Sequence, residues 1–252
     1  MSSSLAGTVL SHLSSRGGHP ALTWYGADGG RLELSGYVVA NWITKTTNLL
    51  VDEFSADDGT TVAIDLPAHW RTLCWVLSSW HVGAQVVLGP DAAGQSIDIV
   101  ATSRPELWQR ADAEVLAVAL PALARRFPDP LPAGVIDAGP AVMGCSDVLG
   151  WVPQPVAQQT ALTLHDADVT YGELPHWLEA RASSALNTAA IAERRVIIVC
   201  TATEVTPSLL GTLVGCWLGG AAAIVVEPGA AAAADLSRLT SNEYADQVIT
   251  LE

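Results

Sequence analysis

Positive charge is scarce in this chain. The 252 residues include 12 basic residues, of which only Lys45 is a lysine, against 26 acidic residues, for a net charge of −14. Nucleic acids and anionic membranes require clustered lysine or arginine. The closest arginine clusters are only pairs, at 125–126 and 194–195, and we expect both pairs to be solvated ends of helices or strands. The composition therefore predicts neither a nucleic-acid partner nor a membrane partner.

Cysteine is also scarce, and its spacing excludes two uses. The chain has no CxxC pair, and its four cysteines lie far apart and mostly within apolar runs: Cys74, Cys145, Cys200 and Cys216. This pattern favours buried thiols over a disulfide framework or a metal site, and it predicts a reducing, cytoplasmic setting. The N-terminus has no basic start followed by an apolar core, so it predicts an amphipathic helix instead of a signal peptide.

One uncharged segment, residues 205–226, is long enough to span a membrane. Pro207 and the pair Gly219-Gly220 interrupt it, and no flanking lysine or arginine anchors it. It therefore predicts a buried helix over 207–218, a turn and a buried strand over 222–226.

Half of the residues are apolar, which is enough for a substantial core. Periodicity and turn residues predict alternating strands and helices. The expected strands are 21–25, 31–34, 61–66, 85–88, 96–101 and 114–120, the expected helices are 36–54 and 69–82, and 127–139 is an irregular connector. This βαβ rhythm predicts an α/β fold with mostly parallel sheets and packed helices.

The second half of the chain repeats the first. Ala21-Leu22-Thr23 recurs as Ala161-Leu162-Thr163, and two further identities share the same offset of 140 residues. The order of elements also recurs, with 80–87 corresponding to 217–224. We therefore predict two pseudo-repeated βα subdomains in one compact unit, the first over 1–140, ending in the Pro/Gly connector, and the second over 141–252.

Residues 20–90 resemble the adenylate-forming (AMP-binding) superfamily, which includes the acyl-CoA synthetases. The matching positions are Pro20-Ala21-Leu22, Asn48-Leu49-Leu50, Leu66-Pro67 with Trp70, and Gly83-Ala84 with Val86-Val87. The resemblance covers the N-terminal part of that family's large domain, and it is closest to a short actinobacterial branch of unknown function. It implies a domain of two similar α/β subdomains, which agrees with the repeat.

The resemblance implies an ATP-binding loop at "HDADVTYGELP", residues 165–175. In the family, a Ser/Thr/Gly-rich loop ending in lysine wraps the phosphates there. This stretch instead has one glycine, three carboxylates and no lysine. As a degenerate phosphate-loop position, it supplies the candidate ligand-binding residues Asp166, Asp168, Thr170, Tyr171, Gly172 and Glu173. The carboxylates could form a metal or acid/base cluster, but a hairpin turn and helix start is the favoured interpretation, because Ala27-Asp28 and Glu33 occupy the equivalent places.

Other departures from the family indicate that adenylation is lost. Residues 200–206 lack the family's acyl-pocket histidine, and the chain ends at Glu252, before the family's later motifs and catalytic lysine. His81 has no visible catalytic partner, and its position favours a helix cap. We therefore expect no catalytic residue, no bound metal and no cofactor.

These observations favour a protein without adenylation activity that acts as a small-molecule or protein-binding module, with a nucleotide or acyl compound as possible ligand. One alternative is an atypical ligase-like enzyme completed by a partner chain or by Mg²⁺-dependent carboxylates. Another is a dimeric scaffold, because a shortened family domain would expose apolar surface, and a homodimer is expected for the same reason.

Overall fold

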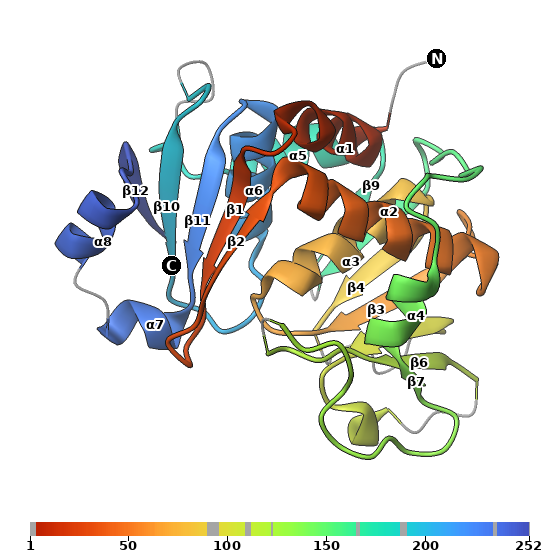
Figure 1. Cartoon of the computed structure of the whole chain (residues 1–252). Coiled ribbons are helices and arrows are strands. Elements are labelled where there is room, and N and C mark those ends of the chain that lie inside the picture. The colour runs from red at the N-terminus through yellow and green to blue at the C-terminus, as the bar shows by residue number, and fades with distance from the viewer. Residues whose placement is uncertain are drawn as a thin grey trace. The chain divides into compact units, whose positions relative to one another are not determined.

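The computed structural model describes residues 4–89, 96–108, 112–121, 123–164, 167–186, 191–233 and 236–251. The fold is α/β, and its strands form two separate sheets (Figure 1). The chain divides into two compact units, one around each sheet. Unit 1 comprises residues 1–6, 41–67 and 71–174, and unit 2 comprises residues 7–40, 68–70 and 175–252.

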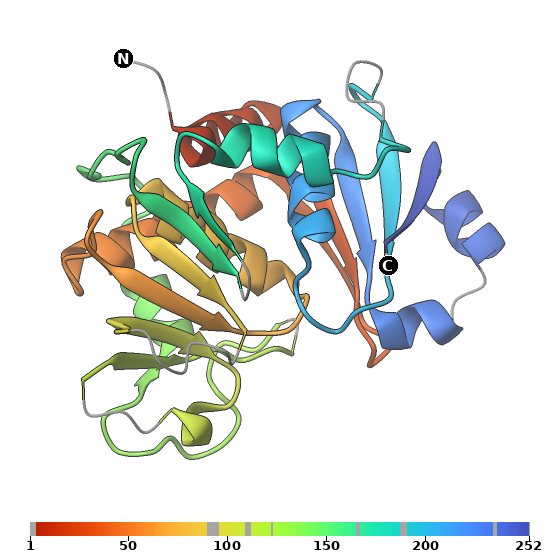
Figure 2. The same ribbon diagram turned by 180° about the vertical axis from the view of Figure 1, so that it is seen from behind.

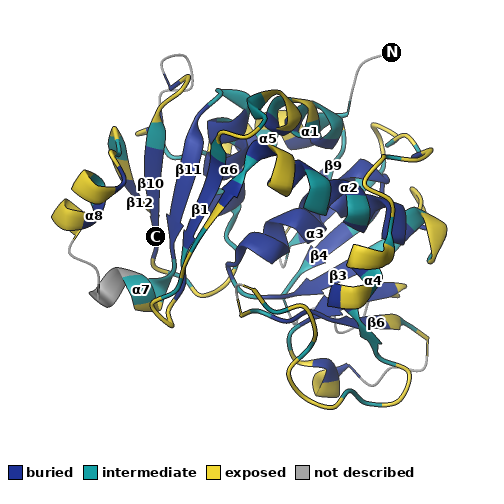
Figure 3. Ribbon diagram, in the orientation of Figure 1, coloured by how far each residue is buried: buried dark blue, intermediate teal, exposed yellow. Residues whose placement is uncertain are grey.

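Unit 1 contains a seven-stranded sheet with the order β7-β6-β5-β3-β4-β8-β9. Its strands are β3 (Thr61–Asp65), β4 (Gln85–Leu88), β5 (Ile99–Thr102), β6 (Glu114–Ala117), β7 (Ile136–Asp137), β8 (Thr160–Leu164) and β9 (Ala167–Thr170). All neighbours are parallel except the hairpin β8–β9. The central strands are almost fully buried (Figure 3), as expected for a parallel sheet covered on both faces.

Four helical segments accompany these strands. They are α2 (Gly36–Asp52), which begins in unit 2, α3 (Trp70–His81), a short 3-10 helix (Pro105–Leu107) and α4 (Ala138–Gly144). The backbone N–H of Val38 donates to the Ser35 hydroxyl at 3.3 Å. Ser35 therefore caps α2.

Unit 2 contains a five-stranded sheet with the order β12-β10-β11-β1-β2. Its strands are β1 (Pro20–Tyr25), β2 (Arg31–Ser35), β10 (Arg195–Cys200), β11 (Ala222–Val226) and β12 (Gln247–Leu251). Its helices are α1 (Leu5–Arg16), α5 (Leu174–Arg181), α6 (Pro207–Leu218), α7 (Pro228–Ala233) and α8 (Leu236–Asn242). Seen from behind, α5 and α6 lie over one face of this sheet (Figure 2).

The uncharged segment 205–226 forms the predicted buried helix and strand. Thr206 caps α6 by accepting a hydrogen bond from the N–H of Leu209, and Pro207 occupies the first turn, where its missing N–H costs nothing. After the glycine pair, β11 is buried along its whole length. Within the described part of the chain, no helix is long and apolar enough to cross a membrane.

Each half of the internal repeat contributes one hairpin to the sheet whose other strands come from the other half. The first-half hairpin β1–β2 extends the unit 2 sheet through β11, and the second-half hairpin β8–β9 extends the unit 1 sheet through β4. The register shifts at equivalent places, between Pro20 and Leu22 in one hairpin and between Thr160 and Leu162 in the other. The units are therefore discontinuous in sequence, whereas the sequence predicts contiguous subdomains 1–140 and 141–252.

Two tryptophans hold the exchanged hairpins in the same way. In unit 1, the indole N–H of Trp80 donates to the carbonyl of Ala161 at 2.8 Å. In unit 2, the indole N–H of Trp217 donates to the carbonyl of Ala21 at 3.0 Å. Ala21 and Ala161 are separated by the offset of 140 that defines the repeat, so the two halves share this buried contact as well as their order of elements.

Candidate functional site

The connection between β8 and β9 is very short. Leu164, the last residue of β8, already pairs with Ala167, the first residue of β9. Only residues 165 and 166 lie between the two strands in the sequence, and the predicted candidate Asp166 is one of these two, which lie outside the described residues.

Two predicted carboxylates have partners within this hairpin. Asp168 accepts a hydrogen bond from the Thr163 hydroxyl at 2.6 Å. Glu173 accepts one from the Thr170 hydroxyl at 2.7 Å and one from its backbone N–H at 3.1 Å. These hydrogen bonds from Thr170 hold the pKa of Glu173 below its ordinary value. Both carboxylates therefore act in the hairpin and at the start of α5.

The remaining predicted residues are also engaged by the backbone of unit 1. The Tyr171 hydroxyl donates to the carbonyl of Ala84 at 2.7 Å, and burial raises the pKa of Tyr171. The N–H of Gly172 donates to the carbonyl of Ala157 at 2.8 Å. A β-carbon at Gly172 would lie only 3.1 Å from that oxygen, which explains why glycine fits this turn.

Lys45, the single lysine of the sequence, forms a hydrogen bond elsewhere in unit 1. The ammonium of Lys45, on α2, donates to the carbonyl of Cys145. One turn further along α2, the buried Asn48 binds the backbone of Ser146, Val148 and Gly150 through three hydrogen bonds of 2.9 to 3.1 Å. These bonds fix residues 145–150. Large apolar side chains at the end of α4 and on the segment that follows it are nevertheless exposed: Met143, Val148 and Trp151.

The cysteines and His81 have the environments of core residues. All four cysteines are free, and three are buried. Burial raises the pKa of Cys74, Cys200 and Cys216 to about 12, which leaves these thiols protonated and unreactive. His81 ends α3, as the sequence predicts, and burial lowers its pKa, so it is neutral at pH 7. No group of three or more histidine, cysteine or acidic side chains in the described ranges could hold a metal ion.

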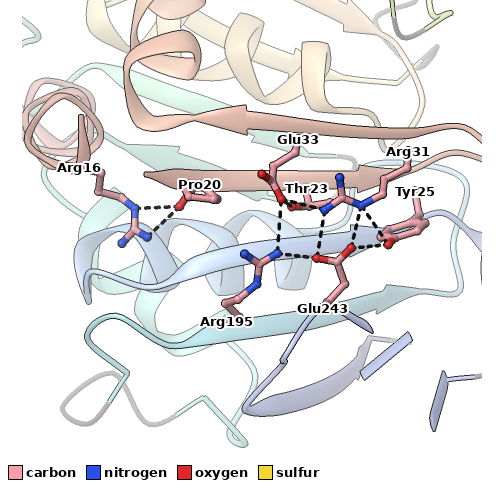
Figure 4. Close-up of polar contacts among 8 residues, drawn as sticks. All are labelled: Arg16, Pro20, Thr23, Tyr25, Arg31, Glu33, Arg195 and Glu243. Atoms are coloured by element: carbon pink, nitrogen blue, oxygen red, sulfur yellow. Dashed lines mark hydrogen bonds and ion pairs between the residues drawn. The ribbon is translucent and has the colours of Figure 1, made fainter. Parts of the chain in front are cut away.

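A cluster of charged residues in unit 2, the Glu243 cluster, surrounds one buried carboxylate (Figure 4). The cluster consists of Tyr25, Arg31, Glu33, Arg195 and Glu243. Glu243 accepts hydrogen bonds from the Tyr25 hydroxyl, from Arg31 at 2.7 Å and from Arg195 at 2.5 Å. Glu33 forms a second ion pair with Arg31 at 2.8 Å and approaches Arg195 at 3.5 Å.

The sheet register explains why these residues meet. Tyr25 is directly opposite Arg31, and Thr23 is opposite Glu33, so alternate residues of β1 and β2 share one face. Arg195, the first residue of β10, lies on the same sheet, and Glu243 follows α8. Ile197, Val199, Ile224, Val226 and Leu239 form an apolar core in the same unit, with Tyr25 packed against it.

Electrostatics makes Glu243 the centre of the cluster. Burial alone would raise the pKa of Glu243, but hydrogen bonds from Arg31 and Tyr25 and the charges of Arg31 and Arg195 lower it to about 2. The hydrogen bond to Glu243 in turn raises the pKa of Arg31, against the effect of burial. Glu243 is therefore ionised and paired at neutral pH although its side chain is only 4% exposed.

Arg195 corrects one expectation from the sequence. The pair 194–195 is predicted to be solvated, and Arg194 is indeed exposed, but the Arg195 side chain is only 24% exposed and ion-paired. Its partner Glu243 is 48 residues away in sequence, beyond any local charge pattern. The other arginine pair, 125–126, is exposed as predicted.

Beside this cluster lies an open cavity of about 520 Å³ in unit 2. Its lining residues are Ser15, Arg16, His19, Pro20, Glu193, Arg195 and Ala222. Pro20, Arg195 and Ala222 are the first residues of β1, β10 and β11, so the cavity lies at the amino ends of three neighbouring strands. Two arginines and one carboxylate make it a candidate binding site that local sequence patterns do not indicate.

The fold is that of acyl-CoA synthetases and related adenylate-forming enzymes. An acyl-CoA synthetase from Brucella canis superposes on 98% of this chain with a TM-score of 0.73 at 18% identity, using 47% of its own length. A fatty acyl-CoA synthetase from Mycobacterium tuberculosis matches 96% of the chain with a TM-score of 0.69 at 11% identity, using 48% of its length. The predicted resemblance is therefore confirmed at the level of the fold.

A curated relative gives a more specific match in sequence. The TIGR03089 family protein of Mycobacterium tuberculosis is 39% identical over 132 residues, which cover 49% of this chain and 52% of that protein. No protein-family model matches the chain. The matches thus involve about half the length of the curated relative and of the two synthetases.

Proposed function

We propose that this chain is a small-molecule-binding module on the acyl-CoA synthetase fold and that it does not form acyl adenylates itself. The pairing of Leu164 with Ala167 is the observation that carries this proposal, because it leaves only two residues between the strands where the resemblance implies a phosphate loop. Two residues are too few to place a series of backbone N–H groups around a chain of phosphates. The ammonium of Lys45 is also engaged by a backbone carbonyl in unit 1.

The electrostatics of the hairpin also supports loss of phosphate binding. Asp168 and Glu173 place negative charge where a phosphate loop presents N–H groups and a cation, and like charges repel a triphosphate. The N–H groups of Thr170 and Gly172 already donate to Glu173 and Ala157. A phosphate at this turn would have to displace these bonds.

The proposal is tested by ATP–pyrophosphate exchange with Mg²⁺ and a panel of short, medium and long carboxylic acids. The expected result is no acid-dependent exchange above the protein-free background. Calorimetric titration of the same protein with ATP, AMP, CoA and acyl-CoA then separates binding from chemistry. Acid-dependent exchange would contradict the proposal, and so would failure of every small molecule tested to bind.

The alternative of an atypical enzyme that uses Mg²⁺-dependent carboxylates is addressed by the same assay. Asp168 and Glu173 are bound to Thr163 and Thr170, respectively, which weighs against free metal ligands. Mg²⁺-dependent turnover that Asp168→Asn abolishes would favour this alternative over a binding module.

A homodimer is a second proposal, supported by the exposed apolar side chains of the 143–151 segment. Val148 is 72% exposed and Trp151 is 78% exposed, although hydrogen bonds to Asn48 fix the intervening backbone. Exposed apolar groups on a fixed backbone favour association with little loss of entropy. Sedimentation velocity over a hundredfold range of concentration is expected to show a dimer that Trp151→Glu dissociates. A monomer throughout the range would refute the dimer.

A further inference from the structure

We propose that the unit 2 cavity binds a small metabolite through its carboxylate or phosphate group, with Arg16 as the main anchor and Arg195 as a second donor. This inference rests on the binding part of the proposed function and names its site and ligand chemistry. The cavity volume of about 520 Å³ is within the usual range for small-molecule sites. The cavity lies within unit 2, whereas the hairpin β8–β9 belongs to unit 1.

The charge of the lining favours an anion. The whole chain carries a net charge of −14, yet this cavity is lined by two guanidinium groups and one carboxylate. Arg195 is ion-paired with Glu243 and Glu33, which do not line the cavity, whereas Glu193 is the acidic residue of the lining. An oxyanion in the cavity would neutralise the positive charge of Arg16, which Glu193 offsets only in part.

Arg16 is held in place before any ligand binds. Its Nε and Nη2 donate to the carbonyl of Pro20 at 3.2 and 2.8 Å, and its Nη1 donates to the carbonyl of Gly220 at 2.5 Å. A guanidinium has five N–H groups, so two remain without an acceptor among the described residues. A fixed guanidinium with free donors binds carboxylate or phosphate without losing side-chain entropy.

Two further features of the wall indicate a binding site. The Nε–H of Arg195 is buried and has no hydrogen-bond partner within the part of the chain that the structure describes. Buried donors are normally paired, so this N–H is available to an acceptor. Glu193 has a left-handed backbone with φ of 63°, unusual for a residue other than glycine, and its N–H donates to the carbonyl of Gly220 at 2.9 Å. Such strained residues concentrate at binding sites.

The experiment uses the full chain with inorganic phosphate and malonate as probes, titrated by calorimetry at constant ionic strength. Malonate and phosphate distinguish a carboxylate ligand from a phosphate ligand, and at least one is expected to bind. Arg16→Gln should weaken that binding by about tenfold, the equivalent of one lost charged hydrogen bond. Glu193→Gln should tighten it severalfold, because it removes the carboxylate from the lining. Arg194→Gln, an exposed neighbour that does not line the cavity, is the matched control and should leave binding unchanged.

The two variants are expected to change the anion affinity in opposite directions. The test therefore stays informative if Arg16→Gln disturbs folding, because Glu193→Gln leaves the contacts of Arg16 with Pro20 and Gly220 in place. The inference is overturned if neither probe binds, if Glu193→Gln fails to tighten binding, or if Arg194→Gln matters as much as Arg16→Gln. Its failure is distinguishable from that of the proposed function. Acid-dependent pyrophosphate exchange would refute the proposed absence of adenylation but would not affect the proposed anion site. Unchanged anion binding in the Arg16→Gln and Glu193→Gln variants would refute the anion site but would not affect the proposed absence of adenylation.

Discussion

Glu243→Gln is expected to lower the free energy of unfolding by about 3–5 kcal/mol, the range measured when one partner of a buried ion pair is removed. The substitution leaves Arg31 and Arg195 without their shared carboxylate and weakens the bond from Tyr25. Water reaches the 42% exposed Arg31 more easily than Arg195, so the lower end of that range is expected. Urea unfolding monitored by tryptophan fluorescence measures the change.

The matched control is Glu33→Gln, which removes the more exposed carboxylate of the same cluster. Its side chain is 35% exposed, and it pairs with the same two arginines. An exposed ion pair contributes at most about 1 kcal/mol. Equal effects of the two substitutions would show that Glu243 is not the centre of the cluster.

The contribution of Glu243 also has a defined dependence on pH. Its pKa falls from an ordinary 4.5 to about 2 in the folded chain. A carboxyl with a depressed folded pKa stabilises the fold fully above its unfolded pKa, and this contribution is lost as pH falls through the folded pKa. The stability difference between wild type and Glu243→Gln should therefore be constant above pH 4.5 and shrink toward pH 2. A difference that does not change over this interval would contradict the assigned pKa.

Local patterns in the sequence were sufficient for most elements of the fold. Pro207 and the glycine pair at 219–220 mark the ends of α6, and a continuous apolar run identifies β11, because these signals act within a few residues. Strand β12 was missed because it is short and alternates between exposed and buried residues beside a charged region. Strand β5 begins at Ile99, three residues later than predicted.

Pairings between distant segments could not be predicted from the same patterns. The offset of 140 residues reveals that two hairpins are alike, but it does not say which sheet each hairpin joins. Strand β1 pairs with β11, about two hundred residues later, so the repeat alone suggested contiguous subdomains. The Glu243 cluster and the unit 2 cavity were also missed, because their residues come together only through this long-range pairing. The predicted candidates 168 and 170–173, by contrast, lie within one hairpin and its helix start.

If the repeat reflects equivalent packing, Trp80→Ala and Trp217→Ala should destabilise the chain by similar amounts, about 3–5 kcal/mol each. Both side chains are 1% exposed, and each substitution leaves a buried carbonyl, of Ala161 or Ala21, without its indole donor. Trp151→Ala is the matched control, because its side chain is 78% exposed, and it should change stability by no more than about 0.5 kcal/mol. Urea unfolding at a concentration low enough to dissociate any dimer measures all three. A large effect at one buried tryptophan and a small one at the other would mean that the halves share topology but not the energetic role of this contact.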